Sequence, residues 1–129
     1  MKNKATHVLL VEDEEAHAEL IQLSFESRPD IQLTIAPSLD QARACLAETT
    51  PDLAIIDSLL PDGAGLELIR DLRDESRYPI VLLTSQADKA MEAQALAAGA
   101  ARYVVKSEVT LFEMPEIAAS LLESQDVGD

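Results

Sequence analysis

The sequence is poor in cysteine, in aromatic residues and in long apolar runs. Cys45 is its single cysteine, so the chain cannot form an internal disulfide, which is consistent with a reducing compartment. Its neighbours Ala42, Ala44 and Leu46 indicate a small buried hydrophobic residue. No apolar run exceeds four residues, far short of a membrane span, and no basic start leads into an apolar stretch as in a signal peptide. We therefore expect a cytoplasmic protein that does not enter a membrane.

Positive charge is also scarce. Ten Lys and Arg residues stand against 24 Asp and Glu residues, which gives a net charge of −14. A nucleic-acid-binding surface needs clustered Lys and Arg to neutralise phosphates, so we expect no nucleic acid partner for this domain. The acidic balance suits a cationic partner or a metal ion, although most of the acids should form solvated helix faces. With 129 residues, 47% of them hydrophobic, the chain corresponds to about one globular domain.

Apolar runs typical of strands alternate with helical patterns along the chain. In the first helix, Ala16, Leu20 and Leu23 form the predicted buried stripe, with Ile21 and Phe25 widening it. This alternation predicts right-handed crossovers and a parallel sheet with helices on both faces. The expected fold is α/β: a doubly wound, five-stranded parallel sheet, (βα)5, over residues 1–124, with 125–129 as a tail or the start of a linker. The predicted strands are 6–11, 31–36 (nearer an edge), 53–57, 80–84 and 103–105, with the first, third and fourth at the centre of the sheet. The predicted helices are 14–26, 39–48, 66–73 and 88–98, and a final amphipathic helix is indicated by Met114, Ile117, Ala118, Leu121 and Leu122.

Polar groups of compatible chemistry close four of the predicted strands. Glu12 and Asp13 follow the first strand, Asp57 ends the third, Thr84 the fourth and Lys106 the fifth. Sites in doubly wound sheets form beyond the carboxyl ends of the strands, so we expect these groups to converge. Converging carboxylates repel unless a cation lies among them, and an oxygen-only cluster suits Mg²⁺ or Mn²⁺.

Each of these residues also has a purely structural interpretation. Asp57 could be a loop acid or a helix cap, and Glu12 and Asp13 could favour the positive end of the helix that follows. Thr84 could be an ordinary strand residue and Lys106 an ordinary surface lysine. The functional interpretation depends on their common position at the strand ends.

The two histidines are assigned no role. His7 lies at a strand start and His17 on a helix, and neither has a metal-ligand partner at a useful spacing.

Four segments carry a resemblance to a known family. "VLLVEDE", "DLAIIDSLLPDGAGLELI", "IVLLTSQA" and "GAARYVVKS" resemble, in this order, the receiver domain of two-component response regulators, over residues 6 to 123. The resemblance implies the flavodoxin/CheY-like form of the (βα)5 fold, a three-layer sandwich. It also implies a phosphorylated signalling domain rather than an enzyme acting on a separate substrate.

The resemblance also implies roles for individual residues. Asp57 would be the phosphoacceptor, phosphorylated by a histidine kinase or phosphotransfer protein. Asp13 would ligate Mg²⁺ or Mn²⁺ directly, Glu12 through water, and Leu59 through its backbone carbonyl, with Asp57 completing the set. Thr84 would be the hydroxyl that responds to phosphorylation, and Ser85 the small residue beside it. Tyr103 would be the aromatic residue that changes orientation in the switch, and Lys106 the family's lysine.

The end of the fifth strand departs from the family pattern. Members usually have Lys-Pro there, whereas this chain has Lys106-Ser107, so we predict a trans 106–107 bond. Thr110 to Glu113 matches a capping box, and Pro115 falls in the first turns, which predicts a helix that starts late or kinks. We therefore expect the face formed by helix four, strand five and helix five, the family's usual signalling face, to be reshaped. The domain could form a phosphorylation-dependent homodimer through this face, and we expect the reshaping to alter the usual mode of dimerisation.

Three rival functions make different demands on the sequence. A haloacid-dehalogenase-type phosphatase would need a second Asp where Leu59 stands, and a flavodoxin-like cofactor binder would need a Gly/Ser/Thr-rich loop in place of "VEDEEA". The alternative that stays open is a pseudo-receiver, a protein-interaction module that works without phosphorylation. With or without phosphorylation, we expect output to pass to a downstream partner or a fused domain. The segment "YVVKS" followed by a proline also resembles receivers joined to hybrid sensor kinases.

Overall fold

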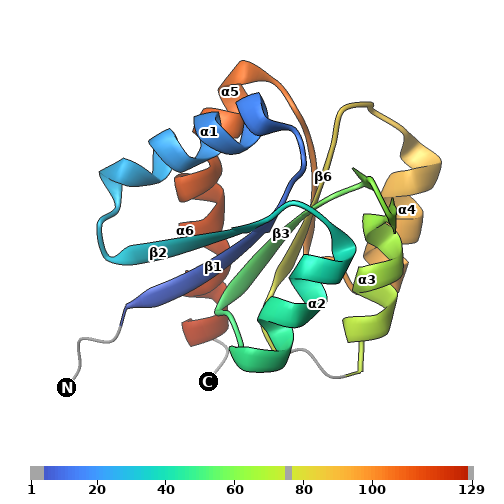
Figure 1. Cartoon of the computed structure of the whole chain (residues 1–129), viewed down its shortest axis with the longest axis horizontal. Coiled ribbons are helices and arrows are strands. Elements are labelled where there is room, and N and C mark those ends of the chain that lie inside the picture. The colour runs from blue at the N-terminus through green and yellow to red at the C-terminus, as the bar shows by residue number, and fades with distance from the viewer. Residues whose placement is uncertain (1–4, 75–76, 128–129) are drawn as a thin grey trace.

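Five parallel strands form the sheet at the centre of the molecule (Figure 1). The computed structural model describes residues 5–74 and 77–127, with side chains up to residue 123. The strand order is β2-β1-β3-β6-β7, so β1, β3 and β6 are central and β2 lies at an edge, as the sequence predicted. The elements are β1 (Thr6–Val11), α1 (Glu15–Ser24), η1 (Phe25–Ser27), β2 (Ile31–Ala36), α2 (Leu39–Glu48), β3 (Leu53–Asp57), β4 (Leu59–Leu60), β5 (Gly63–Ala64), α3 (Gly65–Leu72), β6 (Ile80–Thr84), α4 (Lys89–Ala98), β7 (Arg102–Val105), α5 (Glu108–Phe112) and α6 (Met114–Val127).

Helices cover both faces of this sheet, which gives the predicted three layers. On β3, Ala54 and Ile56 pack with residues of α2, α3 and α4, whereas Leu53 and Ile55 pack with residues of α1, α5 and α6. Every residue of β3 and β6 is buried. A strand covered on both faces needs apolar residues at successive positions, which explains the continuous apolar runs in the sequence.

Helix α1 is rotated relative to the prediction. Its buried positions are Ala18, Ile21 and Ser24, followed by Phe25 in η1, while Leu23 is 54% exposed. The predicted stripe through Leu23 is therefore wrong, because Ile21 and Phe25 lie at the centre of the packed face and not at its margin. The hydroxyl of Ser24 donates a hydrogen bond to the Ile21 carbonyl at 2.6 Å, which satisfies this polar group inside the core.

A short antiparallel hairpin, β4–β5, follows β3 where the sequence predicted only a loop. Asp62 at its turn accepts hydrogen bonds from the backbone N–H groups of Leu39 and Asp40 and so ties the hairpin to the start of α2. Gly65 begins α3 directly against β3, where a Cβ atom would overlap the backbone oxygen of Asp57. Glycine at this position lets α3 start beside the end of β3.

The segment after β7 forms two helices instead of one. Ser107 is the N-cap of α5, and its side chain and that of Thr110 form a reciprocal capping box, so the box predicted at Thr110–Glu113 is wrong. Pro115 lies in the first turn of α6, where a missing N–H removes no helical hydrogen bond, and the late start of the last helix is confirmed. All peptide bonds between described residues are trans, including the 106–107 bond. Helix α6 runs to Val127; residues 128–129 lie outside the described residues, and the predicted domain boundary stays a prediction.

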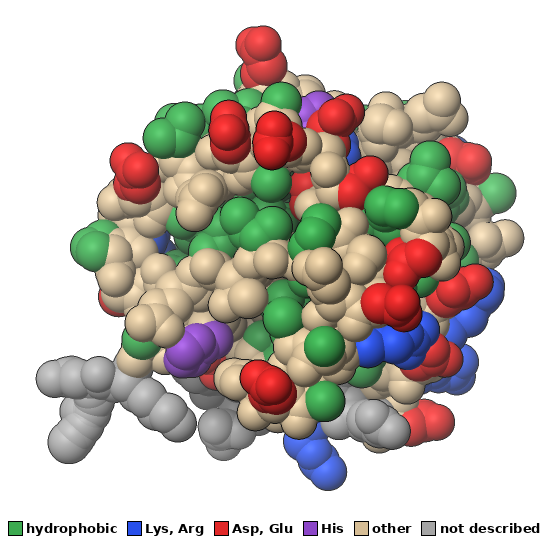
Figure 2. Space-filling model, viewed as in Figure 1, with side chains coloured by type: hydrophobic (Ala, Val, Ile, Leu, Met, Phe, Trp, Pro, Cys, Tyr) green, Lys and Arg blue, Asp and Glu red, His purple; other side chains and the backbone are tan. Residues whose placement is uncertain are grey.

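The surface reflects the acidic composition. Figure 2 shows acidic side chains scattered over one face, and most of the visible basic ones lie at its lower right among acids. Among the described residues, no helix has the length and apolar character needed to cross a membrane.

Candidate functional site

The polar groups that close the strands lie at the carboxyl edge of the sheet, as predicted. Asp57 is the last residue of β3, and Ser58 continues the pairing by donating its backbone N–H to Leu83 O at 2.8 Å. Lys106 follows β7 and donates its backbone N–H to Thr84 O at 2.7 Å. These backbone bonds fix the groups on adjacent, rigid strands.

Three carboxylates form a cluster at this edge. One ligand oxygen from each of Glu12, Asp13 and Asp57 lies within 4.8 Å of the others, and no other such group of His, Cys, Asp or Glu is found among the described residues. Glu12 and Asp57 are buried and Asp13 is exposed, so the cluster reaches from the core to solvent. The structure therefore brings together the three predicted metal-ligand side chains.

Burial and like charge shape the titration of this cluster. Burial raises the pKa of Glu12 from its ordinary 4.5 to about 7, and its interaction with Asp57 adds to the rise, while Lys106 opposes it. Burial also disfavours the charged form of Lys106, but the carboxylates of Glu12 and Asp57 outweigh this effect and hold the lysine pKa above its ordinary value. The lysine is thus a fixed positive charge beside the acids.

Lys106 is placed by three neighbours. Its Nζ lies 3.1 Å from Asp57 Oδ2 and 3.0 Å from His17 Nδ1, both within hydrogen-bond geometry. Nζ also lies 2.9 Å from Glu12 Oε1, but this ion pair lacks hydrogen-bond geometry. His17, to which the sequence assigned no role, thus contacts the site through Lys106. Its position four residues after Asp13, in the helix that starts at the cluster, is the sequence signal that could have located it.

Thr84 and Tyr103 lie on the next two strands and are linked through the β6–α4 loop. Thr84 Oγ1 accepts hydrogen bonds from Ser58 Oγ at 3.0 Å and from Gln86 N at 3.4 Å. The hydroxyl of Tyr103 donates to Gln86 O at 3.0 Å and accepts from Asp88 N at 3.1 Å. Both predicted switch residues therefore contact this loop, but no hydrogen bond joins Thr84 to Asp57 among the described residues.

A cavity of about 470 Å³ opens above the cluster. Leu59 lies at its rim with a 74% exposed side chain, and its backbone N–H is 3.5 Å from Asp57 Oδ1. Ser85 contributes a small side chain to the wall, as predicted. The lining residues are Asp13, Glu14, His17, Asp57, Leu59, Leu60, Pro61, Ser85 and Lys106.

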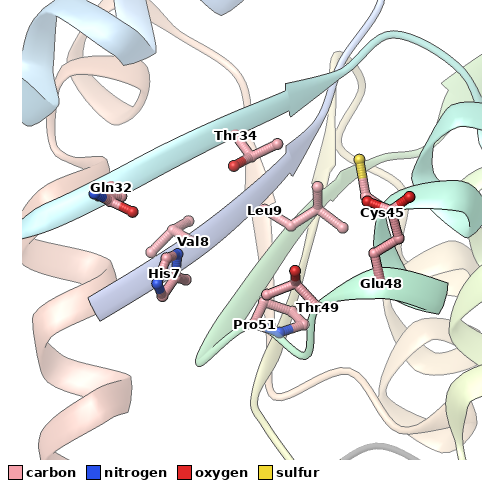
Figure 3. Close-up of a pocket in the computed structure, with 9 residues that line it drawn as sticks. All are labelled: His7, Val8, Leu9, Gln32, Thr34, Cys45, Glu48, Thr49 and Pro51. Carbon is pink, nitrogen blue, oxygen red and sulfur yellow. The ribbon is translucent and has the colours of Figure 1, made fainter. Parts of the chain in front are cut away.

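A second cavity, of about 260 Å³, lies between β1, β2 and the end of α2 (Figure 3). Cys45 points into it from α2 with a free thiol, and it is half-buried against the core where the sequence predicted a buried residue. His7 and Glu48 also line it, but they do not form a metal-ligand group with Cys45. The cavity contains none of the groups predicted to carry chemistry.

The donor set at the first cavity suits a divalent cation. Glu12 Oε1 is buried and forms an ion pair with the Lys106 ammonium group at 2.9 Å, but no hydrogen bond of good geometry reaches it among the described residues. All the side-chain atoms that could ligate a metal here are carboxylate oxygens, the ligands that Mg²⁺ and Mn²⁺ prefer. The chain's own residues thus fit such an ion.

Comparisons with known proteins agree with this arrangement. A sequence profile of the response regulator receiver domain matches residues 8–118. The chain is 38% identical over 101 residues to the KDP operon transcriptional regulatory protein KdpE of Escherichia coli, covering 78% of this chain and 44% of KdpE. It is 38% identical over 115 residues to the phosphate regulon transcriptional regulatory protein PhoB of Rhizobium meliloti, covering 87% of this chain and 48% of PhoB.

A solved structure shows the same fold. The Mn²⁺-bound form of the response regulator Rcp1 matches with a TM-score of 0.76 and 26% identity, over 84% of this chain and 88% of that one. The chain spans less than half the length of the two curated relatives. The profile match nevertheless covers most of its residues, and the chain belongs to the response regulator receiver domain family.

Proposed function

We propose that this domain accepts a phosphoryl group on Asp57 from a histidine kinase or a phosphotransfer protein. Receiver domains act in phosphorylation-dependent two-component signalling and are not classical enzymes. The observation that carries the proposal is a buried carboxylate, Asp57, that borders an open cavity and pairs with Lys106 at 3.1 Å.

The transfer would depend mainly on positioning and charge. An Asp57 oxygen forms a bond to phosphorus while the phosphorus–nitrogen bond of the donor phosphohistidine breaks, and the departing imidazole nitrogen keeps the electron pair. Like charge opposes this attack, and the ammonium group of Lys106 offsets part of the repulsion. The end of β3 holds the nucleophile rigidly, while the hairpin that follows leaves the cavity open.

We propose that Glu12, Asp13, Asp57 and the backbone carbonyl of Leu59 hold Mg²⁺ or Mn²⁺ in the working domain. When bound, such an ion would neutralise charge on the carboxylates and on phosphoryl oxygens. The three-carboxylate cluster supports this assignment. The Mn²⁺-bound form of Rcp1 shows that a protein of this fold binds such an ion.

Phosphorylation would be transmitted through Thr84 and Tyr103. The added charge on Asp57 would attract the Thr84 hydroxyl, and Tyr103 would turn with the β6–α4 loop to which both residues are bonded. The domain then works as a two-state switch.

We extend the proposal to the surroundings of the domain. The receiver spans residues 1–124, works in the cytoplasm, and passes its output to a downstream partner or an attached domain, including that of a hybrid kinase. The matched region covers less than half of each of these two relatives, which supports an output outside this domain. A phosphorylation-dependent homodimer is one form that this output could take.

Phosphorylation by a small phosphodonor with Mg²⁺ tests the central assignment. We expect intact-mass spectrometry to show one added phosphoryl group on the native chain and none on Asp57→Asn, because the amide cannot act as the nucleophile. Asp71→Asn is the matched control, since Asp71 is exposed and pairs with Arg43 away from the cluster, and it should label like the native chain.

Two results would contradict the assignment. Equal labelling of Asp57→Asn would place the phosphoryl group elsewhere. No labelling of a folded native chain would favour the alternative function, a pseudo-receiver that binds its partner without phosphorylation.

A further inference from the structure

The residue after Asp57 contacts the proposed switch hydroxyl directly. Ser58 Oγ donates a hydrogen bond to Thr84 Oγ1 at 3.0 Å across the ends of β3 and β6. Ser58 is itself fixed on both sides, because its N–H donates to Leu83 O at 2.8 Å and its carbonyl accepts from Gly65 N at 3.0 Å. The backbone of Ser58 is thus fixed next to Thr84, the side chain that would move in the proposed switch.

The contact determines which way the Thr84 hydroxyl points. A hydroxyl oxygen has two acceptor positions, and in Thr84 these are occupied by Ser58 Oγ and Gln86 N. Thr84 is only 2% exposed and is not among the residues that line the cavity above Asp57. To reach an oxygen of a phosphoryl group in that cavity, the Thr84 side chain has to turn away from Ser58.

The same hydrogen bonds continue to the far side of the β6–α4 loop. Gln86 accepts the Tyr103 hydroxyl through its carbonyl, and Asp88 donates its N–H to that hydroxyl. The Asp88 side chain in turn caps α4 by accepting from Ala90 N and Met91 N. Holding Thr84 therefore holds the loop, the tyrosine and the start of α4 in one arrangement.

We propose that Ser58 is a positioning residue that holds Thr84 in the resting orientation and so opposes activation. The inference rests on the proposed phosphorylation of Asp57. A ligand shifts a two-state equilibrium only by its differential affinity for the two states. A hydrogen bond made only in the resting state therefore weakens the apparent affinity for any group that the active state binds.

Titration with beryllofluoride, a phosphoryl analogue, in saturating Mg²⁺ tests this role. We expect Ser58→Ala to bind beryllofluoride about five-fold more tightly than the native chain, the factor that corresponds to a typical hydrogen bond of about 1 kcal/mol. Ser58→Thr keeps the hydroxyl and should restore the native affinity. Affinity for Mg²⁺ alone should be unchanged in Ser58→Ala, since the Ser58 side chain belongs to neither the carboxylate cluster nor the cavity wall.

A double-mutant cycle separates the proposed contact from other effects of the substitution. In a Thr84→Ala background, Ser58→Ala should leave beryllofluoride affinity unchanged, because the partner of the serine is gone. Equal or weaker binding by Ser58→Ala in the native background would overturn the proposal, and so would the same five-fold gain in the Thr84→Ala background. A native chain that binds no beryllofluoride would instead contradict the proposed function itself.

Discussion

At the scale of the residue, the environment of Lys106 explains how a strongly acidic site can hold together. Its ammonium group has three N–H donors and three neighbours, Glu12, Asp57 and His17. His17 places its Nδ1 3.0 Å from this ammonium group and carries no carboxylate charge. It therefore orients the lysine while the two buried carboxylates supply the charge that keeps it protonated.

Because of Glu12, we expect the stability of the protein in metal-free buffer to fall as pH rises toward neutrality. Because its pKa is raised from 4.5 to about 7 on folding, the folded state binds more protons than the unfolded state between these values. The contribution of Glu12 is fully present below pH 4.5, decreases as pH rises toward 7, and is lost above it. One group can change the free energy of unfolding by up to about 1.4 kcal/mol per pH unit in this window.

Urea unfolding of the native chain and of Glu12→Gln between pH 4.5 and 8 measures this effect. The variant removes the titration but keeps the shape, so the native chain should lose stability relative to it as pH rises to about 7. Parallel curves for the two proteins would show that the burial of Glu12 does not perturb its ionisation.

At the scale of the element, the strands could be predicted and the packing angle of one helix could not. The runs ending at Asp57 and Thr84 are continuous and bounded by Pro51 and Pro79, so their identity and their common edge follow from sequence. The two-residue strands β4 and β5 have no periodicity to detect. In α1, Leu23 and Ile21 belong to overlapping apolar stripes, and only packing against the sheet selects between them.

The candidate site shows the same division. Its carboxylates and lysine could be predicted because they stand at strand ends, and the ends of apolar strands can be located in the sequence. The contacts of Ser58 with Thr84 and of His17 with Lys106 join residues 26 and 89 positions apart, and they depend on side-chain direction. Sequence spacing alone contains no information about that direction.

Ser107, which stands where the family usually has proline, is the N-cap of α5, so we expect it to stabilise this helix. Ser107 Oγ accepts from Thr110 N at 3.0 Å, and Thr110 Oγ1 accepts from Ser107 N at 2.8 Å and donates to Val105 O at 2.7 Å. Ser107→Ala should lower the free energy of unfolding by about 1 kcal/mol, the usual effect of losing such a cap. Urea unfolding measures it, and Ser107→Asp, which keeps an acceptor at the N-cap, should retain most of the stability. If both variants lose the same amount, the cap does not stabilise this segment.

At the scale of the whole molecule, the net charge of −14 makes every cation stabilising to some degree. Dissolved salt screens repulsion among the acidic side chains, so added Mg²⁺ would raise stability even without a site. A specific site adds a further contribution to the free energy of unfolding, which depends on the affinity for Mg²⁺. Comparison with KCl at equal ionic strength separates this contribution from screening.

We expect Mg²⁺ at one hundred times its Kd to raise the free energy of unfolding by about 2.7 kcal/mol beyond the effect of matched KCl. Asp13→Asn should lose this Mg²⁺-specific part but keep the response to KCl, because it removes one exposed ligand from the cluster. In metal-free buffer the same variant should be more stable than the native chain, since it relieves repulsion with Glu12 and Asp57. Asp71→Asn removes one acidic charge outside the cluster and should keep the full Mg²⁺ response. An Asp13→Asn variant that responds to Mg²⁺ like the native chain would show that the ion acts by screening alone and that the three carboxylates do not form a binding site.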